Sequence, residues 1–244
     1  MPLSRDLQCQ GFARFRFACW TPALAPGRPV AMSKERLIAA KQRWAEKQKA
    51  SGVRARDVRS ADRLPPGQTI TNGFPVLDLG VRPDASPEAW TLTIKGLVEV
   101  PVVLDWAAFR ALPPVEDVSD FHCVTTWSKF DCRWGGVAFT TLYDLVRPAP
   151  EARFVYFTGA DGYSTNVPLE TCLDDDVLVA THFDGKPLAH EHGAPARVII
   201  PKLYAWKGAK FVNGIEFLAE DRLGFWEVRG YSNTADPWTE DRYA

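Results

Sequence analysis

Apolar and polar residues alternate along residues 90–98, where Trp90, Leu92 and Ile94 interleave with threonines and a lysine. A period of two places alternate side chains on the same face of an extended chain, so this segment predicts a β-strand with one buried face. Further short apolar segments predict strands at residues 118–124, 153–158, 177–183, 197–201 and 215–219. Polar, glycine-containing loops separate these segments, as is typical of a β-rich domain.

Helix signals are fewer. Asp105 is suited to cap a short helix over residues 105–112, which Pro113 and Pro114 end, and Thr140 and Thr141 are available to cap a second helix over residues 140–146. A third helix is expected on the surface at residues 33–50, followed by an irregular linker over residues 52–73. Short strands outnumber helices and no G-x-G-x-x-G turn follows a strand, so the pattern predicts an α+β fold with a mixed, strongly β core, not a doubly wound nucleotide fold.

Composition supports one substantial domain. Hydrophobic residues make up 46% of the 244 residues, and nine are tryptophans. We therefore expect an N-terminal extension over residues 1–64 and one domain over residues 65–244. The formal net charge of −1 gives no excess that would favour nucleic acid as a partner.

The cysteines and the apolar runs indicate the expected cellular compartment. Five cysteines at wide spacings suggest neither a disulfide framework nor a paired zinc site, which makes a reducing cytoplasm the expected location. No apolar run reaches the roughly 18 residues of a membrane-spanning helix. Arg5, Arg14 and Arg16 interrupt the apolar residues near the N-terminus, so a cleaved export signal is not expected, and Met32 is an alternative initiator.

The segment at residues 121–136, FHCVTTWSKFDCRWGG, places Cys123 at the end of an apolar strand, followed by small polar residues, Trp127 and Ser128. It resembles the molybdenum-ligand segment of the sulfite oxidase family, in particular its single-domain bacterial branch. The resemblance implies that Cys123 supplies a thiolate to molybdenum beside the dithiolene of molybdopterin. A soft, easily deprotonated sulfur suits such a metal. The alternative is a buried core thiol, because free cysteine is often buried.

Three more segments carry the resemblance, which covers roughly residues 65–220. Residues 71–78, TNGFPVLD, resemble the family's pterin-contacting segment, with Asn72 and Phe74 at the cofactor; an N-G turn is the simpler explanation. Residues 192–217 begin HGAPARVIIPKLYAWKGAK and resemble the cofactor-anchoring segment. The resemblance would place His192, Arg197, Lys207 and Lys210 at the pterin and its phosphate. Solvated basic residues on a loop explain the same letters.

The remaining segment, residues 158–169, TGADGYSTNVPL, is similar to the family's loop and strand at the cofactor edge. It would bring Asp161, Tyr163 and Ser164 near the pterin, although a plain hairpin around Asp161-Gly162 is equally consistent with these residues. The closing aromatics, including Trp226 and Tyr231, are expected to pack in the core more than over an active-site mouth.

The resemblance implies a sulfite-oxidase-type enzyme that moves an oxo group to or from a small substrate, with electrons exchanged through a separate partner. Thr71 stands where sulfite oxidases have a sulfite-binding Arg, and residues 124–127 (VTTW) replace an Arg-rich stretch after the cysteine. Sulfite is therefore doubtful, and an S- or N-oxide is the more sensible substrate class.

Three other hypotheses remain open at this point. A thiol enzyme would pair Cys123 with one of the histidines. A zinc site would use Cys172, His182, His190 and His192, although their spacing matches no common structural zinc pattern. A binding module without a cofactor would keep the fold and lose the chemistry.

Overall fold

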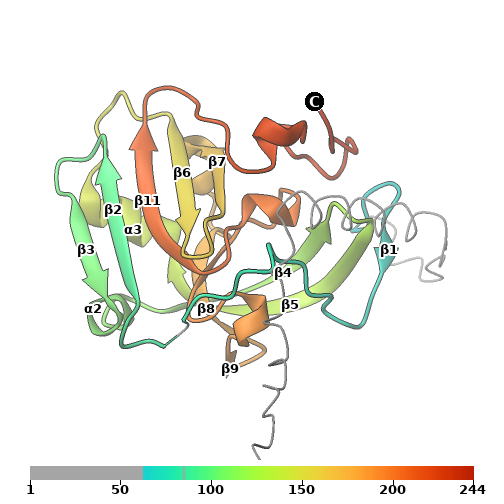
Figure 1. Cartoon of the computed structure of the whole chain (residues 1–244), viewed down its shortest axis with the longest axis horizontal. Helices are drawn as coiled ribbons and strands as arrows, with labels where there is room; N and C mark the ends of the chain where they lie inside the picture. Colours follow the sequence, from blue (N-terminus) through green and yellow to red (C-terminus); the bar gives the residue numbers. More distant parts are fainter. Residues whose placement is uncertain (1–62, 85) are drawn as a thin grey trace, which may run out of the picture. The chain divides into compact units, whose positions relative to one another are not determined.

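The computed structural model describes residues 63–84 and 86–244, which form two β-sheets with a few short helices (Figure 1). The helix predicted at residues 33–50 and nearly all of the predicted N-terminal extension lie outside these residues. Both sheets and the short helices agree with the predicted α+β class. No helix within the described part of the chain is long and apolar enough to cross a membrane.

The first sheet has five strands in the order β3-β2-β11-β6-β7. Strands β2 and β11 are parallel, and the other neighbours are antiparallel. Strand β11, which is late in the sequence, therefore lies in the middle of the sheet beside β2, which is early. This pairing connects the beginning and the end of the domain. The bounds are β2 Thr91–Gly96, β3 Val102–Asp105, β6 Phe154–Gly159, β7 Ser164–Pro168 and β11 Val212–Leu218.

The second sheet is built around the long strand β5, Trp127–Ala138. One edge of β5 pairs along its length with β4, Val115–Cys123. Its other edge pairs with β1, Thr69–Ile70, in parallel near its start and with β8, Leu178–Phe183, near its end. Strand β8 also pairs with β9, Lys186–Pro187, and β10, Arg197–Ile199.

Helix α3, Phe139–Val146, packs against the five-stranded sheet. The ring of Phe139 lies 6.1 Å from that of Phe157 on β6 and 6.0 Å from that of Phe217 on β11. A second, smaller core surrounds Trp134 on β5 and includes Cys132. The other helical turns are α2 Trp106–Arg110, α4 Leu169–Cys172, η2 His190–His192, η3 Ala205–Lys207 and η4 Glu227–Arg229.

Most of the predicted elements are present. The strands at residues 90–98, 118–124, 153–158, 177–183, 197–201 and 215–219 correspond to β2, β4, β6, β8, β10 and β11. Asp105 caps α2 as predicted, because its carboxylate accepts from the amide of Ala108 at 2.8 Å. The predicted threonine cap of α3 is wrong. Strand β5 runs directly into α3, so Ala138 is the N-cap and the amide of Phe139 donates to the Val177 carbonyl instead.

Strand β5, the longest strand in the described residues, was not predicted from the sequence. Its sequence, WSKFDCRWGGVA, lacks a clean alternation because the pairing register shifts at Ser119/Phe121 and again at Gly135/Gly136. Asp131 also adopts a positive φ of 54° within the strand. Bulges of this kind change which face successive side chains occupy, so a period of two is lost.

Candidate active site

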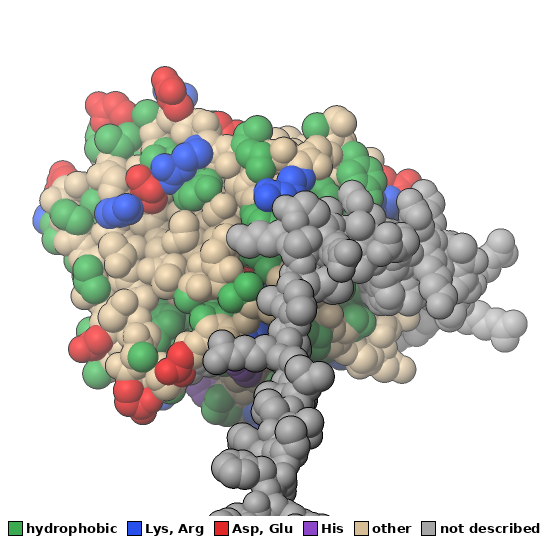
Figure 2. All heavy atoms as spheres, in the orientation of Figure 1, with side chains coloured by type: hydrophobic (Ala, Val, Ile, Leu, Met, Phe, Trp, Pro, Cys, Tyr) green, Lys and Arg blue, Asp and Glu red, His purple; other side chains and the backbone are tan. Residues whose placement is uncertain are grey.

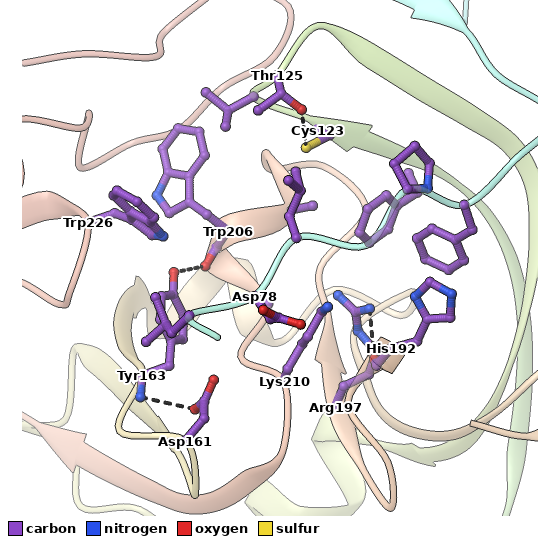
Figure 3. Close-up of a pocket in the computed structure, with 18 of the residues that line it drawn as sticks. Asp78, Cys123, Thr125, Asp161, Tyr163, His192, Arg197, Trp206, Lys210 and Trp226 are labelled. Atoms are coloured by element: carbon purple, nitrogen blue, oxygen red, sulfur yellow. Dashed lines mark hydrogen bonds between the residues drawn. The ribbon is translucent and has the colours of Figure 1, made fainter. Parts of the chain in front are cut away.

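Six separate segments of the chain line a pocket of about 110 Å³ (Figure 3). Its lining includes seven of the residues that the sequence predicts to hold the cofactor: Phe74, Cys123, Asp161, Tyr163, His192, Arg197 and Lys210. These residues come from segments up to 136 positions apart in sequence, from residue 74 to residue 210. The predicted cofactor residues thus converge on one cavity, which core packing alone would not require.

Cys123 ends β4 at the pocket wall and is 6% exposed. The chain then reverses in a tight turn, where the amide of Thr126 donates to the Cys123 carbonyl at 3.1 Å and Thr126 has a φ of 69°. The Cys123 Sγ lies 3.0 Å from the Thr125 hydroxyl, as Figure 3 shows. A thiolate at this position would therefore accept a hydrogen bond from a side chain of its own turn.

Arg197 is a buried cation at the start of β10, with 2% of its surface exposed. Its Nη1 donates to the His192 carbonyl at 3.1 Å, and its guanidinium lies over the ring of Phe121. The Nε has no hydrogen-bond partner among the residues that the structure describes. Burial lowers the pKa of Arg197 to about 10, so the side chain still carries its charge at neutral pH. A buried donor of this kind suits an anionic ligand.

His192 and Lys210 lie close to this guanidinium in Figure 3. The His192 ring stacks on Phe74 with centroids 4.2 Å apart, and burial lowers its pKa to about 4, with the charge of Arg197 adding to the effect. Lys210 Nζ donates to the Glu191 carbonyl at 2.6 Å. Gly193 allows this approach, because a Cβ there would lie 2.9 Å from the Lys210 Cβ, and its φ of 104° favours glycine.

Asp161 and Tyr163 lie on the turn between β6 and β7, which is the hairpin that the sequence allowed. The Asp161 carboxylate accepts from the amide of Tyr163 at 3.0 Å, and burial raises the Asp161 pKa. The Tyr163 hydroxyl donates to the Trp206 carbonyl. Tyr163 therefore supports the wall of the pocket, while Asp161 offers a carboxyl group to its interior.

Four predicted site residues do not line this pocket. Asn72 is exposed, and Ser164 pairs with Thr158 in the β6–β7 hairpin. Ser128 is buried, with its Oγ 2.8 Å from His122 Nδ1. Lys207 is fully buried and forms an ion pair with Glu227 at 2.8 Å, so this ammonium is already neutralised inside the protein. The geometry gives no support to a role for Lys207 at a cofactor phosphate.

The lining residues that were not predicted to hold the cofactor include Asp78, Thr125, Trp206, Trp226 and Tyr231. Trp226 and Tyr231 were expected to pack mainly in the core, and they are buried, yet both also face the pocket. Nothing in their local sequence distinguishes them from core aromatics. Only the return of the C-terminal segment to the pocket reveals their position.

Tyr231 lines the pocket and is only 6% exposed. Burial is the main cause of its raised pKa, and the nearby Cys123 contributes. A phenol that stays protonated at the wall of a pocket can donate to a bound ligand.

The four residues considered for zinc do not form a site. Within the described part of the chain, no group of three or more His, Cys, Asp or Glu side chains is placed to hold a metal ion by protein ligands alone. Cys172 is fully buried in the main core. A metal carried by a separate organic ligand remains compatible with the single thiol of Cys123.

The pocket fits molybdopterin on its own chemistry. The cofactor ends in a phosphate, and the buried Arg197 with an unpartnered Nε offers a charged donor for such an anion. The thiol of Cys123 offers one soft protein ligand to a metal already held by two sulfurs. These two groups lie in the same cavity.

Comparison with known proteins gives the same assignment. A family described as "Oxidoreductase molybdopterin binding domain" matches residues 79–226. An uncharacterized oxidoreductase, YuiH of Bacillus subtilis, is 38% identical over 191 residues, which cover 78% of this chain and 96% of YuiH. The putative protein-methionine-sulfoxide reductase subunit YedZ1 of Azospira oryzae is 30% identical over 68% of this chain and 64% of its own length.

More distant matches agree with the fold. The protein-methionine-sulfoxide reductase catalytic subunit MsrP of Campylobacter jejuni is 28% identical, with 57% of this chain and 52% of MsrP covered, so the match spans about half of that relative. The sulfane dehydrogenase SoxCD from Paracoccus pantotrophus aligns with a TM-score of 0.52 at 23% identity, over 57% of this chain and 40% of that chain. This chain therefore belongs to the oxidoreductase molybdopterin-binding domain family, as a sulfite-oxidase-like enzyme with a molybdenum–molybdopterin cofactor.

Proposed function

We propose that this oxidoreductase moves an oxygen atom between a small S- or N-oxide and water, with Cys123 as the protein thiolate on molybdenum. The observation that carries the proposal is the position of Cys123 Sγ, buried at the wall of the same pocket that holds Arg197, His192 and Lys210. When bound, the cofactor supplies a two-electron change between Mo(VI) and Mo(IV) together with the gain or loss of an oxo group.

The surroundings of Cys123 support a substrate that is not an oxoanion. Thr125, Trp206 and Trp226 lie on this side of the pocket, whereas Arg197, Lys210 and His192 lie together on another side (Figure 3). Thr71, where sulfite oxidases have an Arg, does not line the pocket. Two relatives carry protein-methionine-sulfoxide reductase in their names, which favours reduction of a sulfoxide as the direction.

The residues of this chain have separate tasks in such a reaction. The Thr125 hydroxyl donates to the Cys123 thiolate and lowers its electron density. The Tyr231 hydroxyl donates to the oxygen of the substrate as negative charge develops there. Reduction of a sulfoxide to a sulfide and water consumes two electrons and two protons, so a separate electron-transfer partner is part of the proposal.

The direct test of the thiolate is metal and pterin analysis of Cys123→Ala protein produced in a host that makes the cofactor. We expect near one molybdenum and one pterin per chain in the parent, an altered molybdenum spectrum in the variant, and loss of sulfoxide reduction. Cys132→Ala is the matched control, because Cys132 is also buried but lies in the second core. An unchanged spectrum in Cys123→Ala, or a folded parent without cofactor, contradicts the proposal.

Tyr231→Phe tests the proposed donor with little change of shape. Loss of one donor to developing charge should reduce kcat by about 100- to 1,000-fold, the range typical of oxyanion-type donors. Cofactor content should stay at the parental level, since the ring remains in place. A variant with parental kcat would show that the phenol acts only in packing.

A further inference from the structure

The ion pair between Lys207 and Glu227 is fully buried and has no role in the proposed chemistry. Lys207 Nζ lies 2.8 Å from Glu227 Oε1, and the two side chains are 0% and 1% exposed. Moving two charges out of water carries a large desolvation cost, so a buried pair of this kind is weak evidence that the pair stabilises the fold. The pair is better explained by a need to hold its two segments in a fixed geometry.

Both partners of this pair belong to segments that line the pocket. Lys207 ends η3, directly after Trp206, and Glu227 begins η4, directly after Trp226. Trp206 and Trp226 both line the pocket, as does Tyr231, which follows η4. Neither Lys207 nor Glu227 lines it. The pair therefore lies behind the aromatic wall and joins its two halves.

Glu227 also fixes the wall directly. Its Oε1 accepts from Trp206 Nε1 at 3.2 Å and from the Thr165 hydroxyl of β7 at 3.0 Å, in addition to Lys207. The orientation of the Trp206 indole is thus set by a carboxylate on another segment. The amide of Tyr231 donates to the Trp226 carbonyl at 3.2 Å, so the turn that Glu227 begins also places Tyr231.

Lys207 ties the pair to the rest of the fold. Its Nζ donates to the backbone carbonyl of Asn166 on β7 at 2.9 Å and lies 3.5 Å from Asn233 Oδ1 in the C-terminal segment. The amide of Phe225 donates to the Ser164 carbonyl at 2.8 Å, which brings the segment before η4 onto the same strand. Three parts of the chain that are distant in sequence are therefore held at one buried point.

We propose that the Lys207–Glu227 ion pair is a positioning element, which sets the rings of Trp206 and Trp226 and the hydroxyl of Tyr231 relative to Cys123. Its catalytic consequence rests on the proposed function, whereas its effect on the aromatic wall does not. The pair assigns Lys207 a role away from the cofactor, in contrast to the role that the sequence resemblance implies. Loss of the ion pair therefore changes the placement of the substrate and leaves cofactor binding unchanged.

The decisive experiment replaces both charges at once by the double substitution Lys207→Met and Glu227→Met. Apolar replacement of a buried pair is often neutral or stabilising, so the melting temperature should stay near that of the parent. Molybdenum and pterin content should be unchanged. Misplacement of the wall should raise KM and lower kcat for a small sulfoxide, by about 10- to 100-fold in kcat/KM, as small displacements near reacting groups do.

Two further variants complete the test. Thr165→Val removes one donor to Glu227 with little change of shape and should cause a smaller loss of kcat/KM in the same direction, even if the double variant does not fold. Lys202→Met with Asp174→Leu is the matched control, because it removes a Lys–carboxylate pair of 2.6 Å at the surface and should leave every parameter unchanged.

The outcomes separate the two proposals. Near-UV circular dichroism and tryptophan emission should change in the double variant but not in the control, whether or not the enzyme reduces a sulfoxide. Parental spectra and parental kcat and KM in a folded, loaded double variant would overturn the positioning role. Loss of pterin from that variant would also overturn it, since Lys207 would then act at the cofactor. A spectral change without any oxo transfer by the parent would refute only the proposed function.

Discussion

At the residue scale, burial determines the charge that each pocket group carries. Arg197 keeps its charge because its lowered pKa of about 10 is still far above neutrality. His192 becomes neutral because burial, helped by Arg197 and Lys210, lowers its pKa to about 4. The pocket therefore offers Arg197 and Lys210 as cations beside a neutral imidazole that stacks on Phe74.

The lowered pKa of His192 predicts acid sensitivity. The unfolded chain binds a proton to this residue near pH 6.5, while the folded chain resists it until about pH 4. The contribution of His192 is thus fully present above pH 6.5 and is lost as the pH falls toward 4. His122, whose pKa burial also lowers, acts in the same direction.

Urea unfolding of cofactor-free protein at pH 7.5 and pH 5 measures this effect. His192→Asn should lose less stability between the two values than the parent, because asparagine does not titrate. His190→Gln, at an exposed position, serves as the control. An equal loss in parent and His192→Asn would mean that the acid sensitivity arises elsewhere.

At the element scale, the turn that presents Cys123 is held by the short strand β1 and the residue before it. Gln68 Nε2 donates to the Cys123 carbonyl at 3.2 Å, and the amide of Thr69 donates to the Thr126 carbonyl at 2.9 Å. The Ser128 hydroxyl donates to Gln68 Oε1 at 3.4 Å and lies 2.8 Å from His122 Nδ1. Ser128, expected at the cofactor, instead belongs to this support behind the cysteine.

Gln68→Leu tests whether the support affects the metal ligand. It removes one of two donors to the Cys123 carbonyl, which keeps the Thr126 amide, and costs about 0.5–1.5 kcal/mol of unfolding free energy. We also expect a changed molybdenum spectrum, because the turn that directs Cys123 Sγ is loosened. Ser232→Ala, which removes a buried hydroxyl in the C-terminal segment, is the control and should leave the spectrum unchanged.

At the scale of the whole molecule, the fold buries the Arg197 cation at the wall of a pocket that an anion can enter. An unpaired buried charge destabilises the empty protein, and a ligand that binds only the folded state raises its stability by mass action. The cofactor should accordingly raise the melting temperature well above that of the empty chain, by about 2–4 °C per kcal/mol of binding free energy at this chain length.

The Arg197→Met variant separates the destabilisation of the empty protein by the buried charge from the stabilisation by the bound cofactor. In cofactor-free protein the variant should melt at or above the parental temperature, because a charge with an unpartnered Nε is removed from the interior. In a host that makes the cofactor, the same variant should retain little pterin. Thermal unfolding with pterin quantification checks both points, and a variant that keeps its pterin but melts far lower would contradict the assignment of Arg197 to the anion.

The sequence by itself determined the class of fold, most of the strands, and the residues whose chemistry is strong enough to stand out. Alternation predicted β2, and the resemblance of the segments around Cys123, His192, Arg197 and Lys210 to a known family predicted a cofactor site, whose residues the structure brings together in one pocket. Local patterns suffice there, because strand periodicity and short family motifs are properties of single segments.

Only the tertiary structure decided the rest. Strand β5 was missed because its bulges break the alternation. Tyr231 and Trp226 were expected mainly in the core, because their exposure to the pocket depends on distant segments. The family resemblance assigned Lys207 to the cofactor, but the fold places Glu227 2.8 Å from its ammonium. A charged side chain acts through whichever partner the packing brings to it, and that partner is not encoded in its own segment.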